Sequence, residues 1–283
     1  MDQATLDRQY SPSSRVASLD AYLREYERLS GAARSTHPVQ ASLAYGPHSA
    51  ERLDYFPGPG AVRAPLLVFV HGGNWQALGR AESAFSVPPL LAAGAAVAVI
   101  EYGLAPDVGL DAMVGMVCRA VDWLLRHADS LGFNPDRLHL CGTSAGAHLA
   151  AMALLPDVST GPHVSDRIAG AVLLSGMYDL EPVRLSYVND VLRLDEAAAR
   201  RNSPILRLPA RLPETVIARG GNETEEYVRQ HDRMVTALRP RAVVTEVVAD
   251  RRDHFDLPYD LGVPGTGLGD AVLAQMGLEK TTA

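Results

Sequence analysis

The sequence predicts an α/β fold, a doubly wound and mostly parallel sheet with helices on both faces and a small cap. Continuous apolar runs of strand length alternate with stretches whose apolar residues recur at helical spacing. That alternation is typical of parallel strands covered on both faces by helices. A tight turn of sequence Gly-Thr-Ser-Ala-Gly, at residues 142–146, joins one strand to the next helix. The 283 residues, 47% of them hydrophobic, suit a single domain over residues 1–283.

The expected elements follow one another regularly along the chain. An amphipathic helix begins near Leu19 and ends near Gly31. Apolar or alternating runs predict strands at residues 37–45, 52–56, 66–70, 95–102, 137–141, 168–175, 215–218 and 242–249. Apolar residues at helical spacing predict helices at residues 110–125, 148–155, 227–238 and 268–278.

One internal segment interrupts the alternation. Residues 177–213 lack a strand pattern, are rich in Arg, Asp and Ala, and contain several prolines. We expect this segment and the N-terminal helical part, residues 1–35, to form the cap over the site.

Composition and charge exclude several classes of partner. The net charge of −7 and the absence of a Lys/Arg run argue against nucleic acid as a partner. The longest apolar stretch, residues 90–100, is too short to cross a bilayer, and the N-terminus lacks the pattern of a signal peptide. We therefore expect a cytoplasmic protein with no membrane partner. The sequence is compatible with a homodimer and does not fix the oligomeric state.

The two cysteines, Cys118 and Cys141, stand in no metal-ligand spacing. We therefore expect no disulfide framework and no zinc site, and Cys141 is expected to pack as a small apolar residue in a strand.

The Gly-x-Ser-x-Gly turn makes Ser144 the candidate nucleophile. A serine on a sharp strand-to-helix turn has a strained backbone, and glycines two before and two after it let the neighbouring chain pack closely. The hydroxyl then lies clear of the sheet at a helix N-terminus, where amides can face developing negative charge. A turn serine without chemistry is the alternative for the motif taken alone.

The sequence also predicts an oxyanion hole. The apolar run at residues 64–70 ends in His-Gly-Gly-Asn-Trp, a pattern that fits a loop lending backbone amides to the reaction. The donors would be the N–H groups of Gly72, Gly73 and Ala145, which act through position and need no side chain.

His254 is the candidate base, because it follows the last predicted strand and precedes a C-terminal helix. From there a neutral imidazole can reach back to the serine. His148, four residues into the helix that follows the turn, is interpreted as a structural residue.

The acid that orients His254 is less clear, because the loop after the strand at residues 215–218 contains no aspartate. Glu223 is the choice, since a glutamate can orient a histidine as an aspartate does. The alternative is that Glu223 is a solvated residue at the start of the next helix. Asp179, after the preceding strand, is the reserve candidate, and Asp253 is too close in sequence to His254 to be preferred.

Several side chains follow predicted strand ends, the rim where such folds bind ligands. Together they predict an aromatic-lined cleft for a small-molecule substrate. The candidate substrate-binding residues are Asn74, Trp75, Tyr102, Tyr178 and Phe255.

The motifs at residues 71–75 and 142–149 resemble those of α/β-hydrolase esterases of the hormone-sensitive-lipase type. Within that group, further segments are similar to the kynurenine formamidase (arylformamidase) branch, so the resemblance covers almost the whole chain. These segments are residues 9–13, 104–111, 175–180 and 253–255.

In that branch the triad aspartate precedes a Ser-Pro-Glu-Phe-like stretch and an Arg-Gln pair. Here Glu223 precedes Thr-Glu-Glu-Tyr, with Arg229-Gln230 following. Asn74 stands where the family commonly has an aromatic or apolar residue, and Gly103 where related esterases often carry Arg. Both positions lie near the expected pocket and bear on acyl or leaving-group specificity.

The resemblance implies a cofactor-free and metal-free serine hydrolase that cleaves an aryl formamide similar to N-formyl-kynurenine, or an ester, through an acyl-enzyme. The residues themselves indicate only acyl transfer to water. A general carboxylesterase or an amide or carbamate hydrolase of a specialised pathway is the first alternative. A hydrolase-fold binding protein without catalysis is the second.

Overall fold

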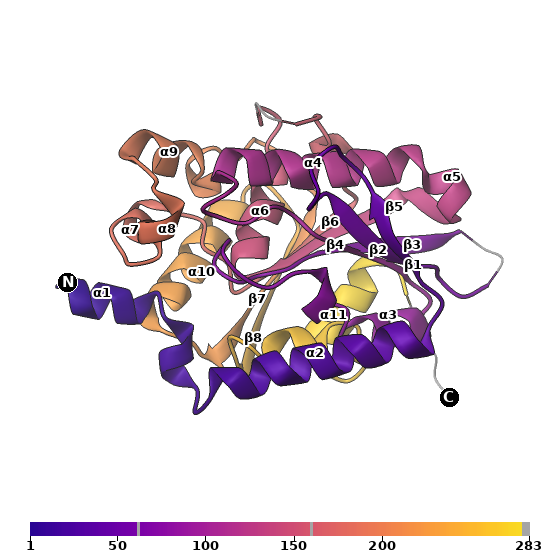
Figure 1. Ribbon diagram of the computed structural model, residues 1–283, viewed down its shortest axis with the longest axis horizontal. Coiled ribbons are helices and arrows are strands. Elements are labelled where there is room, and N and C mark those ends of the chain that lie inside the picture. The colour runs from indigo at the N-terminus through magenta and orange to yellow at the C-terminus, as the bar shows by residue number, and fades with distance from the viewer. Residues whose placement is uncertain (61–62, 159–160, 279–283) are drawn as a thin grey trace.

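The computed structural model describes residues 1–60, 63–158 and 161–278. An eight-stranded sheet in the order β1-β2-β4-β3-β5-β6-β7-β8 forms its centre, with helices on both faces (Figure 1). β1 pairs antiparallel with β2, and β2 antiparallel with β4, whereas the remaining pairings are parallel. The predicted fold class, a doubly wound and mostly parallel α/β sheet, is confirmed.

The parallel strands at the centre of the sheet are the most deeply buried. Every residue of β3, β4 and β6 is buried, as expected for strands covered on both faces. The edge strand β8 instead alternates between partly buried and exposed residues over much of its length. The strands are β1 Gln40–Ala44, β2 Arg52–Phe56, β3 Ala64–Val70, β4 Ala96–Ile100, β5 Phe133–Thr143, β6 Gly170–Leu174, β7 Glu214–Asn222 and β8 Val244–Asp253.

The helices divide between the two faces of the sheet. Buried residues of α4, α6 and α10 share one apolar cluster, and those of α2, α3 and α11 share the other, on the opposite side (Figure 1). The helices are α1 Gln3–Gln9, α2 Leu19–Thr36, α3 Val87–Ala92, α4 Leu110–Arg126, α5 Ala128–Leu131, α6 Ala145–Ala153, α7 Glu181–Arg184, α8 Asn189–Leu192, α9 Glu196–Arg201, α10 Glu225–Leu238 and α11 Gly267–Gln275. None of these helices has both the length and the apolar character that a bilayer span requires.

The predicted end of the N-terminal helix was wrong, because α2 continues through Gly31 to Thr36. Ala33 in the added turn is buried in the core. The Arg34 guanidinium donates to the buried Asp54 carboxylate at 2.9 Å and to the carbonyl of Ala81 at 2.7 Å. These contacts outweigh the low helix propensity of one glycine.

The predicted loop after residue 218 was also wrong. β7 continues to Asn222, and its partner β8 continues to Asp253. A Cβ on Gly220 would lie 2.7 Å from the carbonyl oxygen of Arg252. One on Gly221 would lie 2.6 Å from that of Asp250. The glycine pair therefore serves the close approach of two strands rather than a turn.

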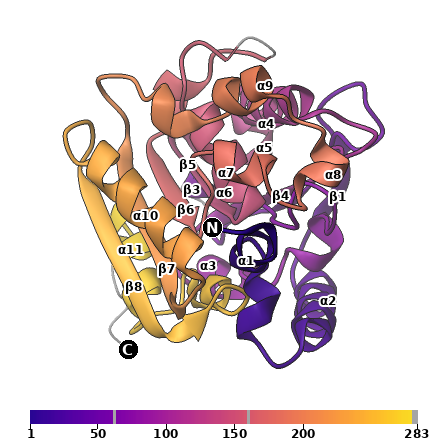
Figure 2. The same ribbon diagram turned by 90° about the vertical axis from the view of Figure 1, so that its left-hand side faces the viewer.

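The two segments proposed as a cap meet at one end of the molecule through α1 and the short helices of the internal segment, whereas α2 runs along the face of the sheet that carries α3 and α11 (Figure 1). Residues 177–213 hold the short helices α7, α8 and α9 and no strand. Figure 2 shows α1 beside α10 and below α7. Gln3 donates to the carbonyl of Leu185 at 2.9 Å, and Asp7 accepts from the amide of Tyr187 at 2.8 Å. α1 and the internal segment are thus hydrogen-bonded directly to each other.

The turn between β5 and α6 has the strained backbone that its sequence predicts. Ser144 has φ 53° and ψ −119°, outside the ordinary regions for a residue with a Cβ. A Cβ on Gly142 would lie 2.2 Å from the carbonyl oxygen of Gly146. A Cβ on Gly146 would lie 2.1 Å from that of Val70. Both glycines are therefore required for β5, α6 and the end of β3 to meet.

Replacing Gly146 by alanine should lower the free energy of unfolding by about 1 to 3 kcal/mol, because the new methyl group overlaps the backbone of β3. Gly31→Ala is the matched control, since nothing lies within 4 Å of a Cβ built there. It should raise the stability by about 0.5 to 1 kcal/mol, because Gly31 lies inside a helix. Urea unfolding of both variants measures the difference, and equal midpoints would contradict the packing argument.

Candidate active site

Four polar side chains follow four neighbouring strands of the sheet. Ser144 comes directly after β5, Ser175 after β6, Glu223 after β7 and His254 after β8. Because these strands are parallel and adjacent, their carboxyl ends meet at one edge of the sheet. The amide of Ser144 donates to the carbonyl of Leu174 at 2.8 Å, which ties the turn to the end of β6.

Glu223 and His254 are brought together by strand register. Asn222 of β7 pairs with Asp253 of β8, so the residues that follow them are neighbours. The Nδ1 atom of His254 lies 3.1 Å and 3.2 Å from the two carboxylate oxygens of Glu223. Both residues are buried. A carboxylate at Nδ1 favours the tautomer with its proton there, which leaves Nε2 able to accept one.

Ser175 also contacts the acid, and the sequence analysis did not single it out. Its hydroxyl donates to the Oε1 atom of Glu223 at 2.6 Å. The carboxylate is thereby held from a second side, by a charge-assisted hydrogen bond. Its place directly after a buried strand was the sequence signal that could have identified it.

Tyr227 of α10 is a second neighbour of the triad that the sequence analysis assigned only to a helix. Its ring meets that of His254 edge to face, with centroids 4.6 Å apart. Its hydroxyl donates to the sulfur of Met177 at 3.5 Å. Burial raises the pKa of Tyr227 well above its ordinary value, and a hydrogen bond with the Ser144 side chain acts in the opposite direction. The phenol is therefore neutral where it meets the serine.

The loop after β3 presents backbone amides beside the Gly-x-Ser-x-Gly turn at residues 142–146. Gly73 has φ 101°, and a Cβ there would lie 2.0 Å from the carbonyl oxygen of Ala77. A Cβ on Gly72 would lie 3.2 Å from that of Ser144, so the two segments are in contact. Within the described part of the chain, the amides of Gly72, Gly73 and Ala145 donate no hydrogen bond. They are free to bind an oxyanion.

A cavity of about 250 Å³ opens onto Ser144 and His254. Its walls come from the loop after β3, from the N-terminal segment and from the loop that carries His254, and most of its lining side chains are apolar. Two of the predicted substrate-binding residues, Asn74 and Phe255, line it.

The other three predicted substrate-binding residues lie outside the lining of this cavity and are fully buried. Trp75 donates to the Nδ1 atom of His148 at 3.3 Å. Tyr102 stacks on His71, with ring centroids 4.2 Å apart. Tyr178 donates its amide to Gln230 at 2.9 Å. Their contacts are those of core residues, because an aromatic residue after a strand end can face inward as well as outward.

The carboxylates of the other candidate acids, Asp179 and Asp253, contact other groups. The carboxylate of Asp179 forms an ion pair with Arg233. Asp253 accepts from the hydroxyl of Tyr22 at 2.6 Å and from the amide of Phe255 at 2.8 Å. Of the candidate acids, the structure brings only Glu223 into contact with the His254 imidazole among the described residues.

His148 lies in the core, as its structural interpretation expects. Its Nδ1 atom accepts from Trp75, so Nε2 donates to the carbonyl of Asn202 at 2.7 Å. Burial lowers the pKa of His148 to about 4. The ring is therefore neutral, and its two hydrogen bonds fix its orientation in the core.

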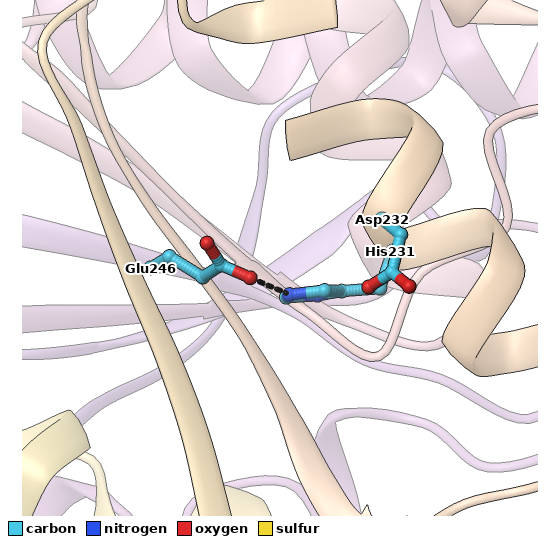
Figure 3. Close-up of side chains that lie close together, drawn as sticks. All are labelled: His231, Asp232 and Glu246. Carbon is cyan, nitrogen blue, oxygen red and sulfur yellow. Dashed lines mark hydrogen bonds and ion pairs between the residues drawn. The ribbon is translucent and has the colours of Figure 1, made fainter. Parts of the chain in front are cut away.

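One further cluster of potential metal ligands lies on α10 and β8, away from the cavity. Figure 3 shows His231 facing Glu246, with Asp232 beside it. The His231 Nε2 atom is 3.3 Å from Glu246, whose other oxygen pairs with Arg239 at 2.9 Å. Burial lowers the pKa of His231, so its neutral ring meets Glu246 through a hydrogen bond, and Arg239 supplies the ion pair. These contacts engage His231 and Glu246 without an ion.

Comparisons with known proteins place the chain. The BD-FAE family model matches residues 53–165. Kynurenine formamidase of Danio rerio is 36% identical over 91% of this chain and 90% of its own length. The enzyme of the same name from Salmo salar is 34% identical over 98% of this chain and 97% of its own length. The chain belongs to the kynurenine formamidase family. It is an enzyme of the hydrolase class.

A solved structure supports the same placement. A candidate thioesterase from Silicibacter sp. TM1040 is 26% identical, with a TM-score of 0.84 over 94% of this chain and 98% of that one. The resemblance to the kynurenine formamidase branch of the α/β-hydrolases is thus confirmed.

Ser175→Ala should lower kcat/KM about tenfold, because the Glu223 carboxylate loses a charge-assisted hydrogen bond and holds the imidazole less firmly. Ser130→Ala is the matched control, since that exposed hydroxyl bonds only to the carbonyl of His127 in its own turn. Steady-state hydrolysis of p-nitrophenyl acetate measures both variants. Equal activity in the two would show that Ser175 has no part in positioning Glu223.

The buried His148 predicts a loss of stability in mild acid. Its pKa falls from 6.5 in an exposed setting to about 4 in the fold. As the pH drops below 6.5, the unfolded chain takes up the proton first, so stability declines until about pH 4. The contribution should reach about 2 kcal/mol at pH 4.5.

Urea unfolding at pH 7 and pH 4.5 measures this decline. His148→Gln should show a smaller decline than the unmodified protein, whereas the exposed His163→Gln control should show the same one. A decline that is identical in both variants would contradict the lowered pKa of His148 in the folded protein.

Proposed function

We propose that this hydrolase cleaves an aryl formamide of the N-formyl-kynurenine type through an acyl-enzyme on Ser144. The observation that carries the proposal is the contact of Glu223 with Nδ1 of His254 at 3.1 Å, beside the cavity that Ser144 lines. The full-length relatives named kynurenine formamidase support the choice of substrate.

The proposed chemistry uses the groups of the site in turn. The Nε2 atom of His254 takes the proton of Ser144 as Oγ attacks the formyl carbon. The amides of Gly72, Gly73 and Ala145 would hold the negative oxygen of the tetrahedral intermediate. The imidazolium returns its proton to the arylamine nitrogen, which leaves. Water activated by the same imidazole then releases formate and restores the serine.

The cavity suits an aromatic leaving group. Leu23, Tyr26, Phe85 and Phe255 contribute apolar side chains to its wall, and Asn74 adds a polar one. Burial of an aryl ring against such a wall is favourable, and a few polar groups fix its orientation. We retain Asn74 and Phe255 as proposed substrate contacts.

Residues 1–35 and 177–213 are proposed to act as the cap. The N-terminal segment is bonded to the strand ends that carry the triad: Arg15 donates to Asn222 at 3.0 Å, and Tyr22 to Asp253 at 2.6 Å. Leu19 from the first segment and Tyr187 from the second line the cavity. A homodimer, a cytoplasmic location, the absence of a nucleic-acid partner and independence from metals and cofactors stay predictions.

Substitutions in the triad test the proposal. Ser144→Ala should lower kcat by about 10⁴-fold or more, and Glu223→Gln by about 10³-fold, because the imidazole then lacks its orienting charge. Asp179→Asn, in the ion pair with Arg233, should change kcat less than about threefold. Turnover of N-formyl-kynurenine, followed by absorbance, measures all three.

A panel of substrates separates the formamidase from a general carboxylesterase. N-formyl-kynurenine should exceed short p-nitrophenyl esters and carbamates in kcat/KM. A preference for the esters by the unmodified enzyme would contradict the proposed substrate while leaving the serine mechanism intact. Equal activity of Ser144→Ala and the unmodified enzyme would contradict the mechanism itself.

A further inference from the structure

One carboxylate stands in the wall of the catalytic cavity without a role in the triad. Glu82 lies at the end of the short 3₁₀ turn Arg80–Glu82 and is partly buried. It lines the same cavity as Ser144 and His254. Of the described residues that line this cavity, it is the one carboxylate, and no lysine or arginine is among them.

The cations nearest in sequence are bonded to other groups. Arg80 forms an ion pair with the fully buried Asp54 and lies 4.0 Å from Glu101. Arg34 pairs with the same Asp54 and donates to backbone carbonyls. Within the described part of the chain, the Glu82 side chain forms no hydrogen bond or ion pair that would neutralise it.

The apolar surroundings of Glu82 strengthen its electrostatic attraction to a cation bound in the cavity. Leu19, Leu23 and Tyr26 of α2 and Phe85 of the next loop line the cavity with it. Apolar walls exclude water and lower the local dielectric, so a charge pair there is stronger than one on the surface. A partly buried carboxylate left unpaired in the free enzyme is correspondingly available to a cation brought by a ligand.

We propose that Glu82 is a specificity residue that selects substrates whose leaving group carries a primary ammonium. The ammonium would donate hydrogen bonds to the carboxylate, while the aryl ring packs on the apolar wall and the acyl carbon meets Ser144. A leaving group that bears an anion and no ammonium is repelled by the same carboxylate, because no lysine or arginine stands among the described residues of the lining to offset it. The inference rests on the proposed function, because it uses the same cavity and leaving group.

A matched series of formanilides tests the charge preference. Three compounds carry an aminomethyl, a hydroxymethyl or a carboxymethyl group at the same ring position, and are thus cationic, neutral or anionic at pH 7.5. The unmodified enzyme should show the highest kcat/KM for the cation and the lowest for the anion. The preference should shrink as the salt concentration rises, since the site is open to solvent at one side.

Glu82→Gln should lower kcat/KM for the cationic compound about tenfold and leave the neutral one within about twofold, because only the charge is removed. Glu27→Gln, on the exposed side of α2 and outside the cavity lining, is the matched control and should leave all three unchanged. An unaltered cation-to-neutral ratio in Glu82→Gln would overturn the assignment. So would an equal loss on all three compounds.

A second series of substrates separates a failure of the role of Glu82 from a failure of the proposed formamidase activity. The same three groups are also placed on phenyl acetate, which any serine esterase with this cavity can hydrolyse. Turnover of the acetates but none of the formanilides would refute the formamidase while the charge ranking among the acetates still decides the role of Glu82. Turnover of both series with no charge ranking in the unmodified enzyme would refute the role of Glu82 alone.

Discussion

The backbone at Ser144 is the constraint to which the rest of the site is fitted. With φ at 53°, the serine holds its hydroxyl clear of the sheet only while β5, α6 and the end of β3 remain in contact. Gly142 and Gly146 permit that contact because each faces a backbone carbonyl where a methyl group would lie. The same contact sets the loop with Gly72 beside the serine. One packing requirement thus positions both the proposed nucleophile and the amides proposed as its oxyanion hole.

The proposed acid and base depend on a second constraint, the register of the last two strands. β7 and β8 pair as far as Asn222 and Asp253, so Glu223 and His254 leave the sheet side by side. Gly220 and Gly221 make that register attainable, since a side chain at either would strike the backbone of β8. Ser175 and Tyr227 then hold the pair from two further directions. The strand ends, rather than a loop, thus fix the distance of Glu223 from the imidazole.

Local patterns predicted the parts of the structure that depend on local physics. The succession of strands along the chain, the helices at α4, α6 and α10, and the strained turn at Ser144 followed from periodicity and glycine spacing. What depends on contacts distant in sequence did not follow. The Gly220-Gly221 pair was interpreted as part of a loop because nothing nearby in the sequence reveals the partner strand. Gly31 was interpreted as a helix end because the contacts of Arg34 are with residues 20 and 47 positions away. Trp75, Tyr102 and Tyr178 follow strand ends but face the core, a direction that their spacing leaves open.

The proposed mechanism requires that Ser144, His254 and the amides of Gly72, Gly73 and Ala145 converge on one reacting carbon. A crystal structure of the enzyme after reaction with a fluorophosphonate tests it most directly, because the bound phosphorus mimics the tetrahedral intermediate. We expect a covalent bond to Ser144 Oγ, a phosphoryl oxygen within hydrogen-bond distance of those amides, and His254 held by Glu223. A label on another residue, or a phosphoryl oxygen turned away from the amides, would contradict it.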